Sequence, residues 1–169
     1  RALEEGVRLA ARVSGDSAAA FAWAYSMAAE ALTKTVVPPR AQAMRGLLLE
    51  RERIANHLGD LGALGNDAGL AFGLTQFSCL KEDLLRVNAE LWGARYPMDV
   101  IVPGGVRMDL PPGGTSRLLD SMAALESEVR LLRNIYNNHA GLQDRFTGAG
   151  CITPELAQPA KMPPAKANE

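Results

Sequence analysis

The chain of 169 residues has only two cysteines, and they lie far apart, at Cys79 and Cys151. A pair with this spacing matches neither a disulfide framework nor a Cys-x-x-Cys metal clip, so we expect two reduced thiols. Aromatic residues make up 5% of the chain. This scarcity disfavours a large sheet, because aromatic and β-branched side chains pack best on a pleated surface. The many Ala and Leu residues favour packed helices.

The sequence also lacks a strong charge of either sign and a long apolar run. Its formal net charge is -1, which predicts no attraction to nucleic acid or to an anionic membrane. No apolar run reaches about 18 residues, so we expect no direct membrane insertion. The sequence has neither a signal-peptide pattern nor an initiator Met, and 1–4 already fit a helical pattern. We therefore expect a piece of a longer chain.

Hydrophobic periodicity and its interruptions predict a mainly helical fold. We expect helices over about 1–12, 17–34, 39–62, 74–93 and 115–139. The best strand candidate is 98–102, so β structure should be limited to a short element near 98–107. One helical domain should span 1–158, with one more helical turn starting at 154–157, and the tail over 159–169 should be disordered.

Apolar stripes predict which helix faces are buried. One stripe comprises Leu47, Ile54, Leu58 and Leu61, and another comprises Leu118, Met122, Leu125, Val129, Leu132 and Tyr136. The segment 17–34 is apolar on most sides and should be deeply buried. Four glycines then follow, at Gly62, Gly65, Gly69 and Gly73. They should end the helix near Gly62 and allow a bend or a close approach of backbones. After Gly141 we expect loops.

The helix starts and ends carry capping signals. Pro39 suits a first helical turn, Gly93 suits a C-cap, and Thr115 or Ser116 can cap the helix that follows. The segment Ser14-Gly15-Asp16-Ser17 predicts a tight turn at its glycine, and Asp16 or Ser17 can accept from the free amides of the next helix.

A serine-hydrolase interpretation of the Ser14–Ser17 segment is less consistent with its surroundings. A nucleophile elbow needs G-x-S-x-G after a strand, but here Ala19 replaces the last glycine and a helix precedes. The Gly-Asp-Ser opening of another esterase family needs an Asp three residues before a late His, where this chain has Tyr136. We therefore prefer the turn and cap.

Polar residues on the 39–62 helix are the main candidates for chemistry. Charges recur at Arg45, Glu50, Glu52, Arg53 and Asp60. Most such runs are solvated faces, but buried charges must be paired, so we expect some of these to form an internal ion-pair network.

Two further residues have both an ordinary and a functional interpretation. His57 shares a face with Glu50 and Arg53, and such a histidine is either a hydrogen-bonded structural residue or a ligand or proton carrier. Asp67 is most simply a cap of the glycine-rich bend. A zinc site built from His57, Cys79, His139 and Cys151 has no recognisable spacing.

A series of motifs resembles one family in order and almost without gaps over roughly residues 8–157. The motif residues are Arg40-Ala41-Gln42-Ala43-Met44-Arg45, Leu49-Glu50, Glu52-Arg53-Ile54, Asn56-His57-Leu58, Asp67, Gly69, Gln76-Phe77, Gly93-Ala94-Arg95, Gly104–Leu110, Gly148-Ala149-Gly150 and Thr153–Ala157. The family comprises the large subunits of energy-converting nickel–iron hydrogenases and the related quinone-module subunit of respiratory complex I. The resemblance implies the helical core of the hydrogenase large-subunit type.

The sequence departs from the family at its first metal site. Hydrogenases of this type carry R-x-C-G-x-C-x-x-x-H, whereas this chain has Ser14 and Ser17 at the cysteine positions and Phe21 at the histidine position. Serine hydroxyls are poor substitutes for thiolates on soft metals. The family's second cysteine pair falls beyond the end of this sequence. We therefore predict that the chain by itself binds no metal.

The complex I relatives bind quinone instead of metal, and the resemblance carries one quinone-linked residue to this chain. The family's quinone tyrosine falls at Gly15, and its hairpin histidine falls upstream of Arg1. The carboxylate that supports that histidine falls on Asp67, which implies a proton-linked role. His57 carries over as a family feature. We therefore name Asp67 and His57 as the site candidates.

The resemblance implies a fragment of an oxidoreductase subunit, active in electron transfer coupled to quinone or proton chemistry but without its own nickel–iron site. Its partners would be an iron–sulfur subunit and membrane-arm subunits, on the cytoplasmic side of the inner membrane. The isolated piece should hold no cofactor and be inactive, with quinone bound in the intact complex. The alternatives are a non-catalytic scaffold or coupling subunit, and an unrelated helical binding module.

Overall fold

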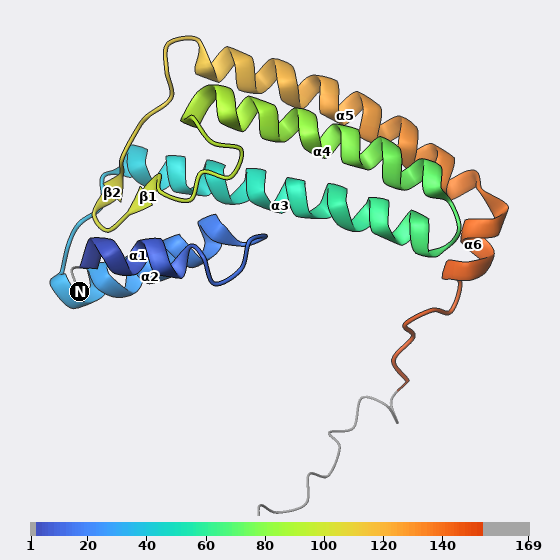
Figure 1. The fold of residues 1–169 in the computed structure, drawn as a ribbon, viewed down its shortest axis with the longest axis horizontal. Helices are drawn as coiled ribbons and strands as arrows, with labels where there is room; N and C mark the ends of the chain where they lie inside the picture. Colours follow the sequence, from blue (N-terminus) through green and yellow to red (C-terminus); the bar gives the residue numbers. More distant parts are fainter. Residues whose placement is uncertain (1–2, 154–169) are drawn as a thin grey trace, which may run out of the picture.

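Three long helices lie side by side and form most of the molecule (Figure 1). The computed structural model describes residues 3–153. Their order is α1 (Leu3–Ala10), α2 (Ala18–Thr33), α3 (Pro39–Asp67), α4 (Ala71–Trp92), β1 (Ile101–Val102), β2 (Gly105–Val106), α5 (Gly114–Asn138) and α6 (Ala140–Phe146). In Figure 1, α1, α2 and the β hairpin gather around one end of α3, and α6 lies at the other end of the bundle.

The fold is mainly helical, as the sequence predicts. Its sheet is one antiparallel hairpin, with Ile101 opposite Val106 and Val102 opposite Gly105. Pro39 opens α3 and Gly93 ends α4 at a left-handed φ of 74°, so both capping predictions are confirmed. None of the helices within residues 3–153 combines the length and the apolar character needed to cross a bilayer. The predicted turn at 154–157 and the tail at 159–169 lie outside the described residues.

Helix α3 continues past the predicted end at Gly62 and stops at Asp67, so that prediction is wrong. Its glycines lie where α4 packs close. A Cβ at Gly62 would come within 3.3 Å of the Phe77 Cβ. Close packing against α4 therefore favours glycine inside the helix. Of the four glycines, only Gly69 has a positive φ, at 87°. The expected close approach of backbones is confirmed.

Two other expectations about the chain after residue 110 are wrong. Helix α5 begins at Gly114 after a left-handed Gly113, and neither Thr115 nor Ser116 caps it. The loops expected after Gly141 begin only after Phe146, because α6 continues to that residue, and 147–153 contain neither helix nor strand. Nδ1 of His139 accepts a hydrogen bond from the Leu142 amide at 3.2 Å and so caps the start of α6. The sequence did not indicate this cap.

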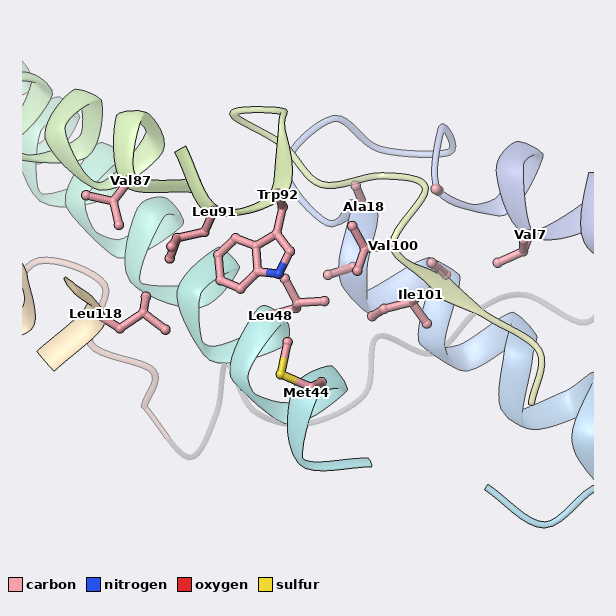
Figure 2. Close-up of a cluster of buried hydrophobic side chains, with 13 residues drawn as sticks. Val7, Ala18, Met44, Leu48, Val87, Leu91, Trp92, Val100, Ile101 and Leu118 are labelled. Carbon is pink, nitrogen blue, oxygen red and sulfur yellow. The ribbon is translucent and has the colours of Figure 1, made fainter. Parts of the chain in front are cut away.

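The core divides into two clusters along the bundle. In the first, Figure 2 shows the Trp92 ring between Leu91 of its own helix and Leu48 of α3. The second lies toward α6, and its buried residues are Ala55, Leu58, Phe77, Leu84, Leu85, Leu132, Tyr136 and Leu142. Both predicted apolar stripes supply buried or partly buried members of these clusters, so the stripes are confirmed.

Helix α2 is only half buried, contrary to expectation. Ala19, Ala22 and Ser26 face the core, whereas Met27 and Leu32 are 57% and 84% exposed. The difference arises because α1, α3 and β1 cover one side of α2 and nothing among the described residues covers the other. Hydrophobicity of a whole segment thus did not predict burial of every face.

Candidate functional site

The Ser14–Ser17 turn joins α1 to α2 and is held mainly by backbone contacts. The Ser17 amide donates to the Ser14 carbonyl at 3.3 Å. Ser17 occupies the N-cap position of α2, but its side chain makes no capping hydrogen bond. The predicted cap from Asp16 or Ser17 is therefore wrong. Gly15 does not have a positive φ, and a Cβ built there meets nothing within 4 Å, so the turn does not require glycine.

The missing cap is supplied by a carboxylate from α3. The amides of Ala19 and Ala20 donate to Oε2 and Oε1 of Glu52 at 2.6 and 3.0 Å. One helical turn further along α3, Asn56 Nδ2 donates to the Asp16 carbonyl at 2.6 Å. Two side chains on one face of α3 therefore fix the turn and the first residues of α2. A carboxylate at this end also complements the positive pole of the helix dipole.

The environment of Glu52 favours its protonated form. Burial is the largest influence on the pKa of Glu52 and raises it, while the hydrogen bonds from the Ala19 and Ala20 amides oppose the rise. The nearby charge of Asp16 raises the pKa further. Glu52 can therefore keep its proton at a pH where an ordinary glutamate has lost it.

A polar hollow of about 450 Å³ lies beside the turn. Its lining residues are Asp16, Asn56, Gly59, Asp60 and Lys81. A Cβ at Gly59 would lie 3.1 Å from Lys81 Nζ, so the ammonium group of α4 lies against the bare backbone of α3. The hollow thus offers a cationic donor beside two carboxylates and an amide.

The two site candidates predicted from the sequence do not line this hollow. His57 is exposed on α3, and Asp67 is exposed at the last position of that helix. At a rise of about 1.5 Å per residue, Asp67 lies about 16 Å along α3 from Asn56. Neither side chain forms a hydrogen bond or an ion pair with another described residue, and both roles stay predictions.

The donor set at the turn does not suit a nickel–iron centre. Ser14 and Ser17 offer neutral hydroxyls where two thiolates would be needed. Cys79 and Cys151 are exposed free thiols outside the turn. Within residues 3–153, no three His, Cys, Asp or Glu side chains are grouped so that they could hold a metal ion.

A buried ion pair links α2, α3 and the hairpin. Nη1 and Nη2 of Arg45 donate to Oε2 and Oε1 of Glu30 at 3.1 and 2.5 Å, and Arg45 is fully buried. The Arg45 Nε also donates to the Gly105 carbonyl at 3.0 Å, and the Gly104 amide donates to Glu30 at 2.8 Å. The expected internal ion pair is therefore confirmed for Arg45.

The other members of the expected charge network are not buried pairs. The Glu50–Arg53 pair is exposed, and Asp60 is also exposed. Sequence reasoning missed Glu30 as the partner of Arg45, although Glu30 is the lone charge in the α2 sequence. A single charge in an otherwise uncharged helix was the available signal.

A second buried arginine also escaped the sequence reasoning. Arg51 is 3% exposed, and its Nε and Nη2 donate to Asn88 Oδ1 and the Leu84 carbonyl at 2.6 and 3.0 Å. Its Nη1 has no hydrogen-bond partner among the described residues. Burial, and then the charge of Arg117, lower the pKa of Arg51 to about 10. Arg51 therefore remains charged at neutral pH without a carboxylate partner.

Known proteins support the resemblance described from the motifs. The family described as the 49 kDa subunit of respiratory-chain NADH dehydrogenase matches residues 67–162. The chain is 38% identical over 133 residues to a subunit of the NADH-quinone oxidoreductase of Thermosipho melanesiensis, covering 79% of this chain and 36% of that protein. It is 31% identical over 150 residues to formate hydrogenlyase subunit 5 of Escherichia coli, covering 89% of this chain and 26% of that protein.

The fold also matches a solved respiratory complex. A chain of the membrane-bound sulfane sulfur reductase, an archaeal respiratory membrane complex, superposes with a TM-score of 0.86 at 24% identity, covering 94% of this chain and 43% of that one. At this identity the match shows the fold alone. The chain spans between about a quarter and about a third of the length of these curated relatives.

Proposed function

The chain belongs to the family of the 49 kDa subunit of respiratory-chain NADH dehydrogenase, and from this premise we propose that it forms the helical core of an oxidoreductase subunit. Its role is in electron transfer coupled to quinone or proton chemistry, without a nickel–iron site of its own. The observation that carries the proposal is the turn at Ser14–Ser17, which has no thiolate but adjoins a polar hollow.

The chemistry of the hollow supports quinone as the ligand in the intact complex. Quinone carbonyls accept hydrogen bonds, and Lys81 Nζ and the Asn56 amide are donors in the lining. Gly15 leaves open space in the turn beside it. When bound, a quinone would supply the electron-accepting chemistry, and this chain would orient its carbonyl groups.

Proton supply is the second role that the residues support. Glu52 lies one helical turn from Asn56, and burial raises its pKa. Asp16 and Asp60 line the hollow itself. On this proposal Glu52 is the proton donor beside the hollow, whereas Asp67 would act from the far end of α3 as a proton-linked partner.

The proposal extends to the assembly. Relatives are named as subunits of NADH-quinone oxidoreductase and of formate hydrogenlyase, and the matching structure is a membrane-bound respiratory complex. We infer that this chain packs with an iron–sulfur subunit and with membrane-arm subunits, as a peripheral subunit on the cytoplasmic side of the inner membrane.

A specific observation favours a second candidate function, a scaffold or coupling subunit without catalysis. Ser14 and Ser17 occupy the positions of the family's two cysteines, and Phe21 occupies that of the metal-site histidine. Gly15 occupies the position of the quinone tyrosine. On this alternative the hollow is only a solvated surface, and coupling passes through the rigid helices.

Quinone-analogue binding to the intact parent complex distinguishes the two functions. Lys81→Met removes the cationic donor and should weaken binding about tenfold, the typical effect of losing one charged hydrogen bond. Asp67→Asn should weaken binding as well. Lys34→Met removes an exposed lysine from the other end of α2 and should have no effect. Binding that is absent, or indifferent to both site variants, supports the scaffold.

Elemental analysis tests the separate statement about metal. The purified protein should contain no stoichiometric nickel or iron, and Ser14→Cys/Ser17→Cys should still contain none, because two thiolates supply only half of the family's ligand set. One nickel or iron per chain in the unaltered protein would overturn the proposed loss of the metal site.

A further inference from the structure

An apolar groove runs between α4 and α5, and none of its lining residues on α4 lines the polar hollow. It encloses about 290 Å³. Its floor consists of aliphatic and thioether side chains, namely Leu80, Leu84, Val87, Met122 and Leu125. On α5 the same face continues beyond the groove to Leu131, which is 57% exposed. The exposed apolar surface is therefore elongated along the two helices.

The rim of the groove carries two arginines and two carboxylates, which differ in their pairing. Arg86 and Arg117 line it, but each is already bound to a glutamate outside the lining, to Glu82 at 3.1 Å and to Glu90 at 2.9 Å. Asp83 and Glu128 also line it, one from each helix. Both are exposed, and neither forms an ion pair with a residue in the described part of the chain. Glu82 also binds Arg95, at 2.5 Å. Each side of the rim thus has one carboxylate without an ion-pair partner, while both arginines of the rim are engaged.

We propose that the groove between α4 and α5 docks a basic amphipathic α-helix of a partner protein. Its apolar stripe would cover the Leu80–Leu125 floor, and Lys or Arg residues flanking that stripe would pair with Asp83 and Glu128. A helix fits because α4 and α5 lie side by side (Figure 1), and helices pack into such grooves through interdigitating side chains.

Other occupants fit these observations less well. An extended peptide needs hydrogen-bond partners for its backbone, and the helices that flank this groove already use their own backbone groups internally. Nucleic acid and anionic membranes offer no cation to pair with the two free carboxylates, and both arginines of the rim are already bound to glutamates. The proposal does not depend on the quinone hypothesis, since the groove shares no lining residue with the hollow.

Two matched synthetic helices test the proposal on the purified chain. One is an amphipathic peptide of Leu and Lys, and the other has the same pattern with Glu in place of every Lys. Fluorescence anisotropy should show that the lysine peptide binds at least about tenfold more tightly. Equal affinities, or no binding of the lysine peptide, would overturn the proposal.

Variants then locate the binding surface. Asp83→Asn/Glu128→Gln should lower the affinity for the lysine peptide about fivefold, as expected for two exposed ion pairs. Ala124→Arg adds bulk and positive charge to the groove wall and should lower the affinity for the lysine peptide further. Asp120→Asn/Asp144→Asn removes the same charge from exposed positions off the groove and should change nothing. A control variant that weakens binding as much as the groove variants would show non-specific attraction and refute the site.

Discussion

The guanidinium group of Arg45 on α3 and the carboxylate of Glu30 on α2 form a bidentate ion pair inside the protein. The same two side chains bind the hairpin through Gly104 and Gly105. A second pair, Arg40 with Asp109, links the start of α3 to the chain after the hairpin. The motif segments at 40–45 and 104–110, far apart in sequence, are therefore held against each other by charge.

Loss of the Glu30 charge should strongly destabilise the fold. Glu30→Gln leaves Arg45 buried without a counter-charge, and we expect the free energy of unfolding to fall by about 3 to 5 kcal/mol. Urea denaturation measures this fall. Glu50→Gln breaks the exposed pair with Arg53 and should cost less than about 1 kcal/mol. Equal effects of the two substitutions would contradict the role assigned to the buried pair.

Acid should break the buried ion pair between Arg45 and Glu30. The hydrogen bond from Arg45 lowers the pKa of Glu30. Because the folded pKa lies below the unfolded pKa, the stabilisation is complete above the unfolded pKa and is lost as pH falls through the folded pKa. The free-energy difference between the unaltered protein and Glu30→Gln should therefore shrink on acidification below about pH 4.5. A difference that stays constant down to pH 2 would contradict this sign.

Glu52 should show the opposite pH dependence. Burial raises its pKa, so the folded protein holds this proton more tightly than the unfolded chain does. Stability from this group is present below the unfolded pKa and is lost as pH rises through the folded pKa. Unfolding curves between pH 4 and pH 8 should thus show Glu52→Gln gaining stability relative to the unaltered protein as pH rises. A gain on acidification would be inconsistent with the raised pKa.

The hydroxyl of Tyr136 occupies a space that requires two glycines. A Cβ at Gly65 or Gly73 would lie 2.1 or 2.0 Å from this hydroxyl, which donates to the Leu61 carbonyl at 2.9 Å. Gly73→Ala should therefore cost about 1 to 3 kcal/mol in thermal or urea unfolding. Tyr136→Phe should recover part of that loss, in a double-mutant cycle.

A control for these glycine substitutions lies on α3. A Cβ at Gly46 meets nothing within 4 Å, so Gly46→Ala should stabilise the protein by about 0.5 to 1 kcal/mol through helix propensity. If Gly73→Ala were as well tolerated as Gly46→Ala, the contact with Tyr136 would not constrain the packing of α4.

A large side chain should be accepted at Gly15. Its φ is not positive, and the space beyond its Cα is open. Gly15→Tyr should leave the melting temperature within about 2 °C of the unaltered value, as is usual for surface substitutions. Gly104→Tyr, at a φ of 87°, should lower it clearly. A large loss at Gly15 would show that the turn depends on its glycine.

The sequence was sufficient to predict elements whose signals are local. Periodic apolar residues located α3, α4 and α5, and Pro39 and Gly93 marked a start and an end that the structure confirms. The short hairpin also follows from residues close to it in sequence. These predictions succeed because helix periodicity and end signals depend on neighbouring residues.

Contacts between distant segments were harder to predict. A cap on α2 was expected from Asp16 or Ser17, next to the helix in sequence, but Glu52 provides it from another helix. Arg45 was expected to be paired, but its partner on α2 was not identified. In each case the local sequence indicated that a partner was required, whereas the identity of that partner depends on how the helices pack.

The fit of Tyr136 between Gly65 and Gly73 also limits the order in which these positions can change during evolution. A lineage that gains a side chain at either glycine while the tyrosine remains produces a steric conflict. A lineage that first loses the tyrosine hydroxyl gives up one hydrogen bond and then has more room for the change at either glycine. Related sequences should therefore show bulk at position 65 or 73 chiefly where position 136 has already become smaller.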